Sequence, residues 1–174
     1  MTTTDFASFE RLQTAVDAAG VGTWDYDLVA DTLTWSPRCK ELFGVPADQQ
    51  VTYADFVELV HPDDRAATVA AVDQAFDPAG SGTYDIEYRT QWQVPGQPVL
   101  WARATGRAFF DAARTKAYRF IGTISDVTAM RQLQEQLTRS YQDLEVKVTF
   151  RNLELEREVQ QLRARLQAVQ ATAS

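Results

Sequence analysis

The C-terminal part of the chain, residues 128–174, contains neither glycine nor proline. Such a stretch favours one unbroken helix, and roughly 40 helical residues would extend over about 60 Å at 1.5 Å per residue. A single helix of that length cannot bury an apolar stripe against a small domain. The sequence therefore predicts that residues 128–174 form a separate helical segment whose apolar side needs another surface to cover it.

Apolar side chains recur along this segment in steps of three or four residues, as a coiled coil requires. The steps from Leu137 to Tyr141 and from Leu155 to Val159 are four residues where the heptad requires three, and such stutters locally unwind a supercoil. Arg151 also falls on this seam. We expect a parallel homodimer whose helices can rotate or change register; a helix folded back on its own domain is the alternative. The predicted dimer seam contains Leu133, Leu137, Tyr141, Leu144, Val148, Leu155, Val159, Leu162 and Leu166.

The preceding residues predict an N-terminal helical cap over 1–20 and a compact domain over 21–127. The cap is an amphipathic helix over residues 5–19 that ends at Gly20. Within the domain, Ser36 is expected to cap a short helix that begins at Pro37 and ends at Gly44. Two further helices are expected over 53–60 and 62–76.

Alternation of apolar and polar residues predicts five strands around this helical block. Three late strands joined by short turns should form an antiparallel meander. The expected fold class is α+β, with one antiparallel sheet that helices cover on one face. The predicted strands are residues 22–28, 32–35, 84–92, 100–109 and 118–127.

Charge and composition limit the partners that this chain can have. Its formal net charge is −7, and the acidic excess lies in the first 127 residues, which repel phosphate backbones, so nucleic acid is not expected as a partner. No stretch has the roughly 20 apolar residues that cross a bilayer, and the N-terminus has no signal-peptide pattern. Cys39 is the only cysteine, which fits a reducing compartment. We expect a cytoplasmic protein without membrane insertion.

An ordered set of short motifs resembles the PAS superfamily, particularly the subgroup of bacterial sensor kinases and cyclic-dinucleotide enzymes. The resemblance covers about residues 17–128, and the order of the motifs is more specific than any single one. The motifs are Gly22-Thr-Trp-Asp-Tyr-Asp, Trp35-Ser-Pro, Glu41-Leu-Phe-Gly44, His61-Pro-Asp-Asp-Arg65, Glu87-Tyr-Arg89, Trp101 and Asp126-Val-Thr128.

This resemblance implies a five-stranded PAS fold that dimerises, catalyses no reaction itself and relays a signal through its C-terminal helix. The effector, of histidine kinase or cyclic-dinucleotide enzyme type, would lie outside this chain. Two alternatives stay open at this point: a ligand-free PAS module for protein interaction and dimerisation, and a redox, oxygen or light sensor that binds flavin or haem.

The junction between the last strand and the long helix carries the predicted relay residues Asp126, Thr128 and Arg89. Thr128 is expected to cap the helix, and Asp126 faces its positive end. We hypothesise that Asp126 pairs with Arg89 or a neighbouring base and so ties the helix to the sheet.

No cofactor is predicted, although flavin or haem stays an alternative. His61 is the only histidine and a conceivable haem ligand, but it precedes the helix in which haem-binding relatives place theirs. Cys39 lacks the flavin-adduct motif of blue-light members, and a buried structural role is expected instead. Trp35, Trp92 and Trp101 could stack on a noncovalent flavin, but aromatic strand residues usually pack in cores.

The sequence lacks the motifs of common enzyme sites. It has no nucleophile elbow, no phosphate-binding glycine loop and no metal-ligand cluster. One feature suggests room for a small-molecule ligand: alternate strand positions carry small residues, which either face the helices or face outward. These positions are Leu100, Ala102, Ala104, Gly106 and Ala108.

Overall fold

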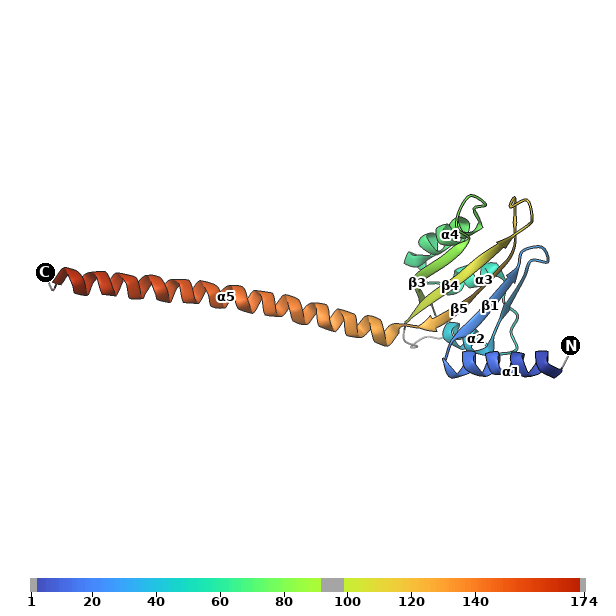
Figure 1. Ribbon diagram of the computed structural model, residues 1–174, viewed down its shortest axis with the longest axis horizontal. Helices are drawn as coiled ribbons and strands as arrows, with labels where there is room; N and C mark the ends of the chain where they lie inside the picture. The colour runs from blue at the N-terminus through green and yellow to red at the C-terminus, as the bar shows by residue number, and fades with distance from the viewer. Residues whose placement is uncertain (1–2, 92–98, 173–174) are drawn as a thin grey trace. The chain divides into compact units, whose positions relative to one another are not determined.

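The computed structural model describes residues 3–91 and 99–172. The chain divides into two compact units, Met1–Ala129 and Met130–Ser174. The first unit contains a sheet with short helices, and the second consists of the long C-terminal helix (Figure 1).

A five-stranded antiparallel sheet forms the centre of the first unit, as the sequence predicted. Its strand order is β2-β1-β5-β4-β3, so the last strand lies in the middle and pairs with both β1 and β4. The last three strands form the expected meander. The strands are β1 (Gly22–Asp27), β2 (Thr32–Trp35), β3 (Thr83–Thr90), β4 (Leu100–Phe110) and β5 (Ala117–Asp126).

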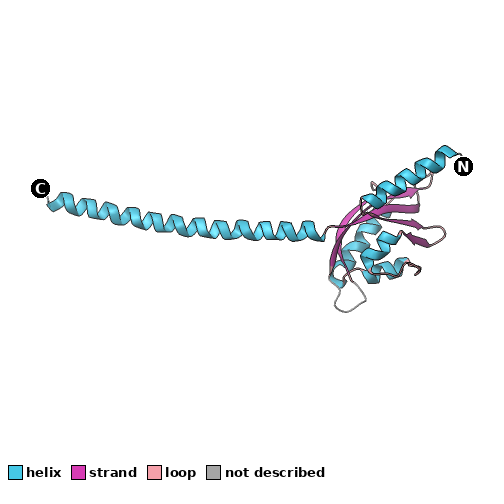
Figure 2. Cartoon of the chain, turned by 90° about the horizontal axis from the view of Figure 1, so that it is seen from below, coloured by secondary structure: helices cyan, strands magenta, loops and turns pink. Residues whose placement is uncertain are grey.

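Three helices cover one face of this sheet: α2 (Pro37–Phe43), α3 (Tyr53–Leu59) and α4 (Pro62–Phe76) (Figure 2). Local signals set their ends. The Ser36 hydroxyl accepts a hydrogen bond from the Cys39 amide at 3.3 Å, and α2 ends at Gly44, whose φ of 68° lies in the left-handed region. The predicted start and end of α2 are therefore confirmed.

The C-terminal ends of one helix and one strand differ from the sequence prediction for a shared reason. Helix α3 ends at Leu59, not at residue 60, because Val60 adopts an extended conformation and forms a β-bridge with Thr90. Strand β3 ends at Thr90, and Trp92, which we had placed at its end, lies outside the described residues. Pairing between distant segments sets these limits, and local periodicity does not contain that information.

The small residues of β4 face the helices, which resolves the choice that the sequence left open. Ala102 and Ala104 are each 1% exposed and lie in the core. Across the neighbouring strands, Trp24, Gly122 and Gly106 occupy paired positions. A Cβ atom on either glycine would overlap the Trp24 indole, so the two glycines form a flat floor for this ring.

Helix α1 (Thr3–Ala18) forms where the sequence predicted an amphipathic helix. Its apolar side is not buried as a core-packed helix would be, since Leu12 is 68% exposed and Val16 is only half-buried. A pattern with helical spacing predicts the helix, but it does not show what covers the apolar side.

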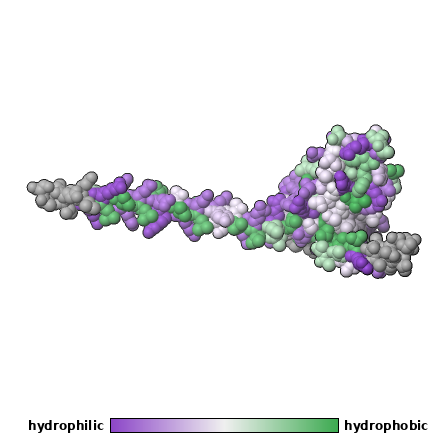
Figure 3. All heavy atoms as spheres, viewed as in Figure 1, coloured by the Kyte–Doolittle hydropathy of each residue, from purple (hydrophilic) through white to green (hydrophobic). Residues whose placement is uncertain are grey.

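Helix α5 (Thr128–Thr172) is continuous over 45 residues; its first two residues belong to the first unit, and the second unit begins at Met130 within it. Apolar residues recur between charged ones along it (Figure 3). Among the described residues, no helix is long and apolar enough to cross a membrane.

Candidate functional site

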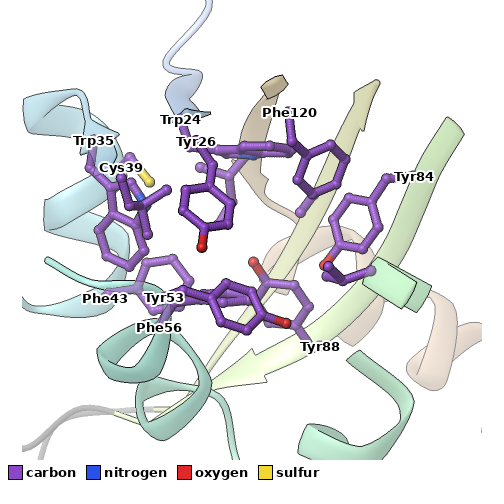
Figure 4. Close-up of a pocket in the computed structure, with 14 residues that line it drawn as sticks. Trp24, Tyr26, Trp35, Cys39, Phe43, Tyr53, Phe56, Tyr84, Tyr88 and Phe120 are labelled. Carbon is purple, nitrogen blue, oxygen red and sulfur yellow. The ribbon is translucent and has the colours of Figure 1, made fainter. Parts of the chain in front are cut away.

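An apolar cavity of about 40 Å³ lies between the sheet and the helices of the first unit (Figure 4). Aromatic rings form most of its wall, and Trp24 and Phe120 are in contact there, with ring centroids 4.6 Å apart. On another side, Trp35 stacks on Phe43 at 4.5 Å. For comparison, an engineered apolar cavity that binds benzene has a volume of about 150 Å³. In this arrangement the cavity has no room for an isoalloxazine or porphyrin ring.

Tyrosine hydroxyls supply the polar atoms of this wall. Figure 4 shows the hydroxyls of Tyr26, Tyr84 and Tyr88 directed towards the space between the rings. Tyr26 donates a 2.6 Å hydrogen bond to Asp31. Burial, with a contribution from Asp31, raises the pKa of Tyr26 to about 12. These hydroxyls stay protonated at neutral pH and can donate hydrogen bonds.

Tyr84 differs from the other polar groups of the cavity. Its side chain is 5% exposed, and its hydroxyl has no hydrogen-bond partner among the residues that the structure describes. Burial raises the pKa of this hydroxyl, so it stays protonated. A buried polar group without a partner is rare in folded proteins and needs an explanation.

The residues that we had considered for flavin or haem lie in different places. Cys39 and Trp35 line the cavity, and burial raises the pKa of the Cys39 thiol, which makes it unreactive. His61 does not line the cavity; it caps α4, and its Nδ1 atom accepts from the Asp63 amide at 3.4 Å. Trp101 does not line the cavity either. Within residues 3–91 and 99–172, no three potential metal ligands come together.

The junction between β5 and α5 is tied to strand β4 through the backbone of Trp101. The Val127 amide donates to the Trp101 carbonyl at 2.8 Å, and the Trp101 amide donates to the Thr128 hydroxyl at 2.9 Å. The Asp126 carboxylate accepts from the Thr128 amide at 2.8 Å. The first residue of α5 is therefore held by β4 as well as by its own strand.

This geometry changes the capping role that the sequence suggested. The Thr128 hydroxyl accepts a hydrogen bond from the Trp101 amide on strand β4, so it does not cap the helix. Asp126 instead accepts the hydrogen bond from the first helical amide, that of Thr128. Both residues satisfy donors near the helix start. The sequence located the junction but not the strand to which it is bound.

Arg89 pairs with Asp64 and not with Asp126, while pairing of Asp126 with a neighbouring base stays a prediction. Its guanidinium donates to both carboxylate oxygens of Asp64, at 2.9 and 2.7 Å, and its backbone amide donates to Asp64 at 2.9 Å. A weaker contact reaches Asp63 at 3.4 Å. These hydrogen bonds lower the pKa of the Asp64 carboxyl below its ordinary value.

Arg89 is connected to the junction through Trp101 and not through Asp126. Arg89 and Trp101 are partners across β3 and β4, and the guanidinium lies over the indole ring at 5.5 Å from its centroid. A continuous series of contacts thus joins Asp64 at the start of α4 to Arg89, Trp101 and Thr128. The sequence reasoning missed Asp64 and the backbone role of Trp101, although both stand in the quoted motifs.

The predicted seam of α5 is exposed to solvent in the single chain. Its described members are between 42% and 62% exposed, which is far from the burial of core residues. Leu166 lies in the helix, but its side chain is outside those described. Arg151, which falls on the same seam, is exposed and pairs with Glu154 at 3.2 Å.

A second apolar stripe on α5 was not predicted. Val146, Phe150 and Leu153 follow helical spacing and are 54%, 65% and 50% exposed. At 100° per residue they lie on the side of the helix opposite to Leu144 and Val148. The three- and four-residue steps that revealed the first stripe could also have revealed this one.

Comparisons with known proteins agree with this geometry. A family model described as the PAS fold matches residues 32–124. The chain is 30% identical over 126 residues to the sensor protein FixL of Bradyrhizobium diazoefficiens, and the match covers 72% of this chain and 24% of that protein. It is 23% identical over 137 residues to the probable diguanylate cyclase DgcE of Escherichia coli, covering 79% of this chain and 12% of that protein.

A solved structure of a sensory box histidine kinase/response regulator from Burkholderia thailandensis has a TM-score of 0.63 and 30% identity, covering 78% of this chain and 98% of that one. The chain spans about a quarter or less of the length of the curated relatives named above. The sheet order, the covering helices and these matches lead to one conclusion: the chain belongs to the PAS family, as a sensor domain homologous to those of histidine kinases and diguanylate cyclases.

Proposed function

We propose that this chain is the sensory part of a larger regulatory protein, and that two copies pair through α5 as a parallel coiled coil. A stimulus changes the sheet, and the paired helices carry that change to an effector of histidine kinase or diguanylate cyclase type. The chain itself catalyses no reaction and works in the cytoplasm, and the single cysteine supports this location because it fits a reducing compartment.

The observation that carries this proposal is the exposed seam of α5. An isolated helix gains little stability from its own sequence, and most helical stability comes from packing an apolar face. The seam leaves Leu137 55% exposed and Leu144 53% exposed over many turns. A second copy supplies a matching seam in register, because identical helices in parallel place identical residues side by side.

The contacts at the start of α5 supply the route from sheet to helix. Movement of α4 shifts Asp64, and its hydrogen bonds pass that shift to Arg89. Arg89 stacks on Trp101, whose amide holds the Thr128 hydroxyl. We propose that Arg89, Asp126 and Thr128 relay the signal through this series, with Trp101 between them.

Disulfide cross-linking of single-cysteine variants tests the parallel dimer. Leu144→Cys lies on the seam, whereas Gln142→Cys is exposed on another side of the same helix. Cys39 is 1% exposed, so the native thiol gives little background. We expect Leu144→Cys to form a covalent dimer at least tenfold faster than Gln142→Cys under mild oxidation. Equal rates, or a monomer in sedimentation at high concentration, would rule out this seam.

The relay has a separate test. In a fusion to a histidine kinase that responds to the sensor, Thr128→Val removes the acceptor of the Trp101 amide and keeps the side-chain size. We expect the response to stimulus to be lost while the dimer persists. Ser125→Ala, one residue before the junction, serves as a nearby control. An unchanged response in Thr128→Val would contradict the relay and leave the dimer standing.

A further inference from the structure

The second apolar stripe of α5 has a charged residue at each end. Asp143 precedes Val146 by three residues, and Arg157 follows Leu153 by four, so the steps from Asp143 through Phe150 to Arg157 are three, four, three and four. These are the steps of a coiled-coil seam, and at about 100° per residue the five positions lie within about 80° of one another around the helix. Asp143 and Arg157 are exposed, and neither forms an ion pair with any described residue.

The apolar centre of this stripe stays uncovered in the parallel dimer. Single apolar residues on a surface need no explanation, but three at seam spacing on one side of a helix match the pattern by which helices pair. The stripe lies opposite to Leu144 and Val148, which belong to the proposed dimer seam. It therefore faces away from the partner helix of that dimer, and only a further chain can cover it.

The charges at the two ends decide the orientation in which a second copy fits this stripe. In a parallel arrangement, Asp143 would lie beside Asp143 of the other copy, and the two Arg157 side chains would also meet, so like charges would repel at both ends. Asp143 and Arg157 are each seven residues from Phe150. A twofold axis at Phe150 therefore places each Asp143 opposite Arg157 of an antiparallel copy, with opposite charges in contact at both ends.

The apolar residues fit the same arrangement. Val146 and Leu153 are four and three residues from Phe150, so in the antiparallel copy each lies close to the level of the other. The two Phe150 side chains, each 65% exposed in the single chain, meet at the axis. One stripe therefore supplies both halves of a matching surface, and no second kind of protein is required.

We propose that the second apolar stripe of α5 binds the same stripe of another copy in antiparallel orientation, so that parallel dimers associate side by side. This goes beyond the proposed sensory function, which requires the parallel dimer alone. Each dimer presents the stripe on two outward sides, one from each helix, so association continues beyond four copies.

The contact is weaker than the parallel dimer. Stable interfaces bury at least about 1,200 Å² in total, more than three apolar side chains from each copy supply. The contact therefore forms at high protein concentration. Its charged ends are exposed, so added salt weakens it.

Mixed disulfides between single-cysteine variants test the orientation. Val146→Cys and Leu153→Cys are mixed, one of them isotopically labelled, and oxidised mildly; Cys39, 1% exposed, contributes little. The antiparallel contact predicts that the mixed disulfide forms at least about tenfold faster than either homodisulfide. Lys147→Cys, which lies on neither stripe, replaces Val146→Cys in the control mixture and should react slowly. Homodisulfides that form as fast as the mixed one would overturn the antiparallel orientation.

Reversal of the end charges tests the complementarity. Arg157→Asp places two acidic residues opposite each other at both ends, and we expect at least about tenfold weaker association of dimers at low salt, read by sedimentation equilibrium. Adding Asp143→Arg to the same chain restores opposite charges in the antiparallel contact, so association should return to within about threefold of the wild type. Unchanged association in Arg157→Asp, or no recovery in the double variant, would overturn the proposal. The absence of species larger than the dimer in the wild type at up to about 1 mM would do the same.

Two further substitutions separate this outcome from that of the proposed function. Phe150→Glu should remove the species larger than the dimer and leave the dimer in place, whereas Leu144→Glu should remove the parallel dimer and leave the mixed disulfide. Loss of the parallel dimer from the wild type with the mixed disulfide intact would contradict the proposed coiled coil alone. An intact parallel dimer without the mixed disulfide would contradict the antiparallel contact alone.

Discussion

The sensor domain and helix α5 use the same kinds of apolar residue in opposite ways. Tyr88 in β3 is 2% exposed, whereas Tyr141 in α5 is 62% exposed. Likewise, Ile124 is 1% exposed and Leu144 is 53% exposed. The domain buries a cluster of apolar side chains within one chain, whereas the large apolar side chains described in the helix are exposed. The difference indicates that the domain can fold by itself, while α5 reaches its full stability only when it pairs.

The strongest test of the domain side of this comparison is Trp24→Ala. The indole fills the space over Gly106 and Gly122 and contacts Phe120 at 4.6 Å. Removing it leaves a large cavity, and we expect a loss of about 3–5 kcal/mol in the free energy of unfolding, measured by urea denaturation. Val29→Ala, at an 82% exposed position, should change the same quantity by less than about 0.5 kcal/mol. A small effect of Trp24→Ala would mean that the core packs differently.

The helix side of the comparison is tested by two matched substitutions. Leu144→Glu places a charge in the proposed seam of each copy, whereas Phe150→Glu places it on the second stripe, in a side chain that is 65% exposed. We expect Leu144→Glu to raise the Kd of the dimer at least about a hundredfold, because the two carboxylates would be buried without partners. Phe150→Glu should change it less than about threefold. The reverse result, read by analytical ultracentrifugation, would assign the seam to Val146, Phe150 and Leu153.

The smallest expected effect concerns the ion pair that joins α4 to β3. Asp64→Asn removes the charge that Arg89 contacts, at a position where both side chains are partly exposed, so we expect a loss of about 1 kcal/mol in unfolding free energy at pH 7. The pKa of Asp64 is lower in the folded chain than its ordinary value. The stabilisation is therefore present above the unfolded-state pKa and disappears as the pH falls through the folded-state pKa.

Denaturation of both proteins between pH 7 and pH 3 checks this sign. The difference between wild type and Asp64→Asn should shrink as the solution becomes acidic. A difference that grows on acidification would contradict the role of the ionised carboxylate.

Local chemistry made much of the fold predictable. Ser36, Pro37 and Gly44 identified both ends of α2, because a cap and a left-handed glycine act within a few residues. Alternation predicted which residues of β1 and β3 face the core. The PAS resemblance implied a five-stranded sheet with helices on one face; the strand order confirms the sheet, and Figure 2 shows the helices on one side of it.

The site was less predictable, because its contacts join residues far apart in the chain. Arg89 lies 25 residues from Asp64, and Trp101 lies 27 residues from Thr128. No periodic pattern indicates which carboxylate an arginine will meet. The missing partner of Tyr84 is also invisible in sequence, because alternation gives the face of a strand residue but not the atoms around its hydroxyl.

The attachment of Val127 and Thr128 to the two backbone groups of Trp101 has a consequence for protein engineering. Strand β4 holds the first residue of α5, and each helical residue after it advances by about 100° around the helix axis. Inserting seven residues between this junction and a fused effector would nearly restore the original azimuth. Inserting two residues would turn the effector by about 200° around the helix axis. The number of residues inserted in a chimera should therefore be chosen by the rotation that it adds and not by the length of the helix.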